Sequence, residues 1–172
     1  MEKYLDNYDN PIAQILNEFL MFLFVIQHDC KSNKMLHNVL IESQKIHTRA
    51  LCEFFLEERK YRDDIIYKDL ITSKIDLTVS MNNNVRDFIN KSSAHISRQR
   101  GKIKIPHKEF KDLQKGLIKS INLFINEMDC NLKSNYVDYY RNEDVQKMRM
   151  NVLTQILTVV TRNAQDGILI KL

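Results

Sequence analysis

The sequence contains very little glycine and proline, with three and two residues in a chain of 172. Turn-rich β architectures use many more of both residues, so their scarcity argues against a β-sandwich or a barrel and favours an all-α fold. The length lies within the usual range of one domain and is sufficient to bury a hydrophobic core without disulfides. We therefore expect one helical-bundle domain over residues 1–172.

Cysteine is also scarce, and long hydrophobic runs are absent. The cysteines are odd in number, form no C-x-x-C pair, and are Cys30, Cys52 and Cys130. This pattern argues against a disulfide framework and favours a reducing, cytoplasmic location. An acid, Glu2, directly follows the initial methionine, so we expect no signal peptide. The most apolar run, 19–26, is less than half as long as a membrane span, so we expect no membrane partner.

Positive charge is concentrated in one part of the chain. Residues 91–119 carry nine Lys/Arg and two Asp/Glu, a net charge of +7, whereas the whole chain has a net charge of +4. We predict that a basic corner, residues 98–119, docks a polyanion such as nucleic acid, or an acidic protein surface. The candidate polyanion-binding residues are Arg98, Arg100, Lys102, Lys104, Lys108, Lys111 and Lys115. The alternative interpretation is a solvated helix face without a ligand.

Apolar side chains recur with the spacing of helices along most of the chain. The pattern predicts an up-and-down bundle of about five helices, over residues 11–29, 35–58, 84–99, 106–130 and 142–167. The first helix is apolar nearly all round in its second half, which is typical of a central bundle helix or of half a dimer contact. We favour the central position and keep a homodimer through the 12–26 helix as the alternative.

The second helix carries a histidine on its apolar stripe. Leu36, Leu40, His47, Leu51 and Phe54 share one face at helical spacing. A core histidine with one hydrogen-bond partner is the simpler interpretation of His47. Arg49 points elsewhere, and we expect it to pair with Glu53 one turn later.

Two short segments follow a different period. Residues 102–105 and 168–172 alternate apolar and polar side chains or are rich in β-branched residues, and each follows a glycine. They are candidates for a short β-ribbon beside the bundle, although an isolated hairpin is only marginally stable.

The sequence contains no known catalytic motif. It has no G-x-S-x-G elbow and no glycine-rich phosphate loop, and His28, Cys30 and His37 do not have a recognised zinc spacing. We therefore expect no metal and no cofactor. A candidate polar site comprises His47, Arg49, Asp63, Asp64, His95, Arg98 and Arg100. These residues would form either an ion-pair network that orders the basic corner or a phosphate site, because arginine forks match phosphate oxygens.

Three blocks resemble a widespread set of small helical bacterial proteins. The blocks are His47–Phe55 (H-T-R-A-L-C-E-F-F), Asp63–Ile65 (D-D-I) and Ile89–Arg100 (I-N-K, A-H-I-S and the final Arg). The similarity covers about residues 36–125. It implies a helical fold and a shared polar site, and no reaction, because that set has no assigned activity. The tryptophan usual after the last block is absent here, and Phe110 stands in its place, which weakens the transfer of a role to His95 and Arg100.

A HEPN-like ribonuclease is the alternative function that the spacing Arg100-x6-His107 suggests, in a toxin or phage-defence setting. Chance alone predicts about 0.8 matches to this loose pattern in such a chain. Gly101 and Pro106 lie inside the match, so one helix would not hold both residues. We interpret the match as accidental. The leading hypothesis is a binding module without catalytic activity, and a structural or inhibitory helical dimer is the third.

Overall fold

The computed structural model describes residues 10–28, 32–55, 64–73, 85, 89 and 107–165. The four long helices in these residues are α1 (Pro11–Gln27), α2 (Lys34–Phe55), α5 (His107–Asn131) and α7 (Glu143–Gln165). The short elements are α3 (Tyr67–Leu70), the 3-10 turn η2 (Ser134–Tyr136) and α6 (Val137–Arg141). The described residues contain no strand beyond one isolated antiparallel bridge between Ile71 and Leu132. The predicted all-α class is confirmed.

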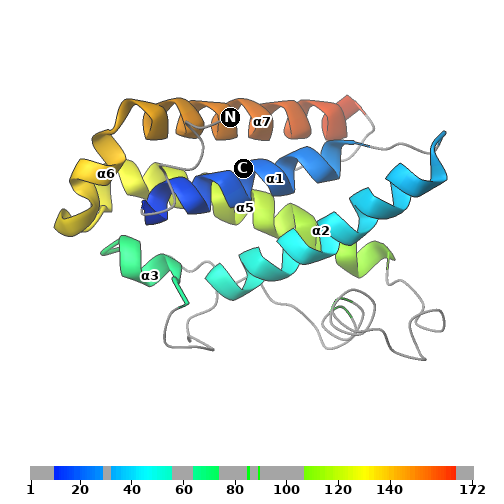
Figure 1. Ribbon diagram of the computed structural model, residues 1–172, viewed down its shortest axis with the longest axis horizontal. Helices are drawn as coiled ribbons and strands as arrows, with labels where there is room; N and C mark the ends of the chain where they lie inside the picture. Colours follow the sequence, from blue (N-terminus) through cyan, green and yellow to red (C-terminus); the bar gives the residue numbers. More distant parts are fainter. Residues whose placement is uncertain are drawn as a thin grey trace.

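Helix α1 lies at the centre of the bundle, between α2 and α7 (Figure 1). Helices α1 and α7 run in one direction, and α2 and α5 run in the other (Figure 1). Side chains of both neighbours reach the last turns of α1: Gln44 donates to the Val25 carbonyl at 2.8 Å, and Gln27 bonds Gln155 at 2.7 Å. The predicted central position of α1 is therefore confirmed. No described helix combines the length and the apolar character needed to cross a membrane.

The core is built around an aromatic cluster. Phe19 of α1 is fully buried, and its ring centroid lies 5.9 Å from Phe54, 6.1 Å from Phe55 and 5.9 Å from Phe124. Centroid distances in this range suit the edge-to-face and offset arrangements that aromatic rings prefer. These four rings come from α1, α2 and α5, so the apolar faces of three separate helices meet at this cluster.

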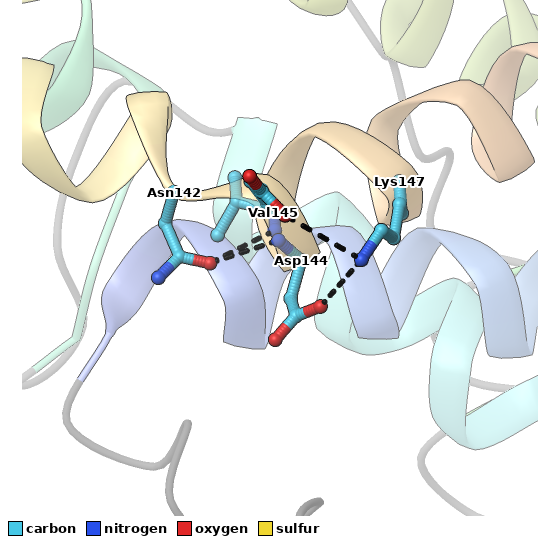
Figure 2. A network of polar contacts seen from close by, with 5 residues as sticks. Asn142, Asp144, Val145 and Lys147 are labelled. Carbon is cyan, nitrogen blue, oxygen red and sulfur yellow. Dashed lines mark hydrogen bonds and ion pairs between the residues drawn. The ribbon is translucent and has the colours of Figure 1, made fainter.

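Asparagine caps begin the first and last long helices. The Asn10 side chain accepts hydrogen bonds from the backbone amides of Ile12 and Ala13 at 3.0 and 3.2 Å. At the start of α7, Asn142 accepts from the amides of Asp144 and Val145 at 2.9 and 3.4 Å (Figure 2). Each cap satisfies amides that the helix itself leaves free, and both helix starts were predicted.

The predicted apolar face of α2 is wrong at its first turn. Leu40, Leu51 and Phe54 are buried, but Leu36 remains 43% exposed. The first turns of α2 extend beyond the end of α1 (Figure 1), so α1 does not cover this part of α2. Periodicity identified the correct face but not the length of the neighbouring helix.

The connection between α2 and α5 is partly described. Helix α3 is a single turn, and the Ile71 bridge that follows it holds the chain against the end of α5, with Thr72 donating to the Asn131 carbonyl at 2.8 Å. Val85 and Ile89 are helical and buried. The rest of the predicted 84–99 helix, and the candidate ribbon at 102–105 and 168–172, lie outside the described residues.

Candidate polyanion-binding surface

Helix α5 has an apolar face and a basic face. Its inner face is buried and consists of Phe110, Leu113, Leu117, Ile121, Phe124 and Met128. Four lysines lie on the opposite face at steps of three, four and four residues. This lysine stripe consists of Lys108, Lys111, Lys115 and Lys119. At a rise of 1.5 Å per residue the lysine stripe is about 16 Å long.

Among the described residues, most of the lysine stripe has no carboxylate partner. Lys115 pairs with Asp112 at 3.3 Å, and the two side chains are 36% and 55% exposed. Lys108, Lys111 and Lys119 are exposed and have no carboxylate partner among the residues that the structure describes. An exposed ion pair such as Lys115–Asp112 contributes little stability and is easily exchanged for another anion. Within the described part of the chain, the lysine stripe therefore presents three cations without a carboxylate partner and a fourth that is weakly paired.

The structure describes only part of the predicted basic corner. Lys108, Lys111 and Lys115 lie on α5, as expected, and Lys119 extends the same face by one turn. The other four predicted residues, Arg98, Arg100, Lys102 and Lys104, lie outside the described residues. His107 is the exposed first residue of α5, while Arg100 is not described, so the HEPN-like pair stays a prediction.

Two described members of the candidate polar site, His47 and Arg49, have different partners. His47 faces α1, where its Nδ1 lies 2.6 Å from Glu18 Oε1, and the two side chains are 16% and 32% exposed. Arg49 instead donates from Nε to Glu53 Oε1 on its own helix at 3.1 Å. Two residues along a helix correspond to a rotation of about 200°, so the two side chains point to different sides.

Of the remaining members of the candidate polar site, the structure describes Asp64. Asp64 is half-buried just before α3. Asp63, His95, Arg98 and Arg100 lie outside the described residues. The pairing of His47 with a single carboxylate fits a structural role, and a shared phosphate site with Arg49 has no geometric support in the described part of the chain.

A polar cluster that the sequence did not reveal joins α5, α6 and α7. The Asp129 carboxylate accepts hydrogen bonds from the Tyr140 hydroxyl and from Arg149 Nη2. Gln146 donates to the Tyr140 carbonyl at 2.6 Å. Burial raises the pKa of the Tyr140 phenol, and its bond to the Asp129 carboxylate adds to the rise. The cluster holds the corner formed by α6 against the two long helices.

A shallow pocket of about 440 Å³ opens beside this cluster. Its lining includes Cys130, which is an exposed free thiol, together with Leu132 and Val137. The Tyr140 hydroxyl proton is donated to Asp129, and an amide proton of Gln146 is donated to the Tyr140 carbonyl, so these lining groups are engaged within the cluster. We interpret the cluster as structural. Asp129 and Arg149 are on different helices, so no short spacing in the sequence could have revealed their pairing.

Two buried polar side chains on α2 were also not predicted. Lys45 is only 5% exposed, and its Nζ donates to Glu42 at 3.0 Å. Thr48 is fully buried, and its hydroxyl has no hydrogen-bond partner among the described residues. A buried lysine is rare unless it is paired, because desolvation of its charge is costly. Thr48 and Lys45 lie four and seven residues before Cys52, so they share the helix face that buries Cys52 and Phe55, and only their polar character hid this spacing.

The chain was compared with known protein-family models, curated proteins and solved structures, and nothing matches. The resemblance of the three sequence blocks to small helical bacterial proteins stays a prediction. Inferences about function therefore rest on the geometry of the described residues.

Proposed function

We propose that the protein is a binding module without catalytic activity that docks nucleic acid along the lysine stripe of α5. The observation that carries the proposal is that Lys108, Lys111 and Lys119 project from one helix face without carboxylate partners among the described residues. Lysines that neutralise phosphates release condensed counterions, and this release drives most binding that does not depend on sequence.

The shape of the surface favours a phosphate backbone over separate bases. The lysine stripe is straight, and a single nucleic-acid strand presents one phosphate about every 3.4 Å along the helix axis. No aromatic side chain lies on this face between Lys108 and Lys119, so the platform that stacks single-stranded bases is missing. Binding is therefore expected to discriminate little among sequences. An acidic protein surface is the other partner class that the same cations fit.

Salt dependence tests the proposal. If the four lysines each neutralise one phosphate, the logarithm of the affinity falls with the logarithm of salt concentration with a slope of about −3 to −4. Fluorescence anisotropy of labelled duplex DNA and single-stranded RNA measures this slope. A slope near zero, or binding of neither nucleic acid, contradicts the proposal, and salt-sensitive capture of an acidic protein in its place favours the other partner class.

A charge-reversal pair locates the surface. The double variant K108E/K111E is expected to weaken binding about tenfold or more and to reduce the salt slope by about two. The matched control K34E/K147E makes the same change in net charge at exposed positions of α2 and α7. Equal weakening by both variants would mean that net charge alone is responsible.

A further inference from the structure

A pocket lies at the end of the bundle where α5 meets α6 and the start of α7 (Figure 1). Its volume is about 440 Å³, and ligand pockets in proteins commonly measure about 300–1,000 Å³. Such pockets combine apolar walls with a few polar groups that orient the ligand. The pocket therefore has room for a small organic molecule, and its lining contains both kinds of group.

The apolar part of the lining is held in position by the fold itself. Met128 is 1% exposed and belongs to the core, and Leu132 and Val137 are half-buried in the same lining. Leu132 also forms the backbone bridge with Ile71. Because these side chains are already ordered, an apolar group that covers them gains from the release of water without ordering the protein.

The polar part of the lining carries one positive charge that no other described lining group compensates. Arg141 is the exposed last residue of α6, and it has no carboxylate partner in the part of the chain that the structure describes. The acid in the lining, Asp129, already accepts hydrogen bonds from Arg149 and from the Tyr140 hydroxyl. Burial raises the pKa of Tyr140, so its phenol adds no negative charge. The charge of the lining therefore favours an anion.

We propose that this pocket binds a small organic anion with a carboxylate head and a short apolar chain. The carboxylate lies on the Arg141 guanidinium, whose fork matches the two oxygens of a carboxylate, and the chain lies over Leu132 and Val137. One guanidinium balances the single charge of a carboxylate, whereas a phosphate ester carries a charge of about −1.5 to −2 at neutral pH. We therefore assign a carboxylic acid to the pocket in preference to a phosphate.

This site is separate from the lysine stripe. Lys119, the last lysine of the stripe, precedes Asp129 by ten residues, which is about 15 Å along α5. A protein that binds no nucleic acid would leave this proposal intact, and a pocket that binds no carboxylate would leave the proposed function intact.

The thiol of Cys130 reports whether the pocket is occupied. Cys130 lines the pocket as an exposed free thiol and Cys52 is buried, so in a Cys30→Ser protein iodoacetamide reacts first at Cys130. The probe is octanoate, and octanamide is the uncharged probe with the same chain. Octanoate has about ten non-hydrogen atoms, so we expect a Kd on the order of 1 mM. At about 10 mM it should slow the alkylation of Cys130, measured by mass spectrometry, at least about threefold.

Arg141→Gln tests the assignment of the anion. This variant keeps a polar side chain but removes the charge, so we expect octanoate to bind about tenfold more weakly, judged against the variant's own alkylation rate without a probe. Lys34→Gln is the matched control, because Lys34 is exposed on α2 and the change in net charge is the same. No protection of Cys130 by about 20 mM octanoate, equal protection by octanamide, unchanged protection in Arg141→Gln, or equal weakening by both variants overturns the proposal.

Discussion

The outer faces of α5 and α7 differ in charge, although both helices bury an apolar face in the same core. The solvent side of α5 carries four lysines within twelve residues, and the solvent side of α7 carries no charge over an equal length. Packing does not require this difference, because neither outer face touches the core. The comparison shows that the inner faces specify the bundle, whereas the core places no requirement on the charge of the outer faces.

The largest expected effect comes from the core that lies beneath both faces. Phe19→Ala removes a fully buried ring that contacts three other aromatic rings, so we expect a loss of about 3–5 kcal/mol in the free energy of unfolding. Urea denaturation measures the loss. Phe24→Ala, at a position that is 48% exposed on the same helix, should cost much less. Similar losses for the two variants would contradict the proposed position of the core.

The second largest expected effect comes from the ion pair that joins α5 and α7. Asp129→Ala removes the carboxylate of α5 that accepts from Arg149 of α7, and Arg149 is only 15% exposed. We expect a loss of about 1–2 kcal/mol, at the lower end for a charged hydrogen bond because Asp129 is 40% exposed. Thermal unfolding checks this value. Asp138→Ala on exposed α6 is the control and should change stability by less than about 0.5 kcal/mol.

The same corner should give stability a dependence on alkaline pH. Because the pKa of Tyr140 is raised in the folded protein, the folded state keeps the phenolic proton above pH 10, where the unfolded chain loses it. The contribution of the protonated Tyr140 phenol to the free energy of unfolding is therefore fully present below about pH 10 and is lost as pH rises further.

Tyr140→Phe tests this dependence and should cost about 1 kcal/mol at neutral pH. The difference from wild type should shrink at about pH 11. Urea denaturation at both pH values measures it. Tyr139→Phe, at a residue that is 44% exposed, is the matched control variant. A constant difference for Tyr140→Phe would show that the phenol titrates alike in both states.

The smallest expected effects come from the helix propensity of one residue in α5 and one in α7. Gly116 lies inside α5, and a Cβ added there meets nothing within 4 Å. Gly116→Ala should therefore stabilise the protein by about 0.5–1 kcal/mol without affecting nucleic-acid binding. Thr161→Ala, at an exposed position of α7, should stabilise it by about 0.5 kcal/mol or less. Chemical denaturation distinguishes the two gains, and a loss at Gly116→Ala would mean that the alanine methyl is not accommodated.

The sequence predicted the positions of the helices better than the side-chain contacts between different helices. The starts of α1 and α7 and the pairing of Arg49 with Glu53 follow from patterns within one segment. The Asp129–Arg149 pair was missed because its partners come from separate helices. The exposure of Leu36 was missed because it depends on where α1 ends.

The sequence by itself determined which stretches are helical and which side of each helix is apolar, because hydrogen bonds and side-chain periodicity within a helix are local. Only the tertiary structure decided which faces are covered. Lys45 lies inside the protein, Met150 and Leu157 lie outside, and Asp129 meets Tyr140 and Arg149, because burial depends on how the long helices lie against one another. The periodicity within one helix carries no information about how the helices lie against one another.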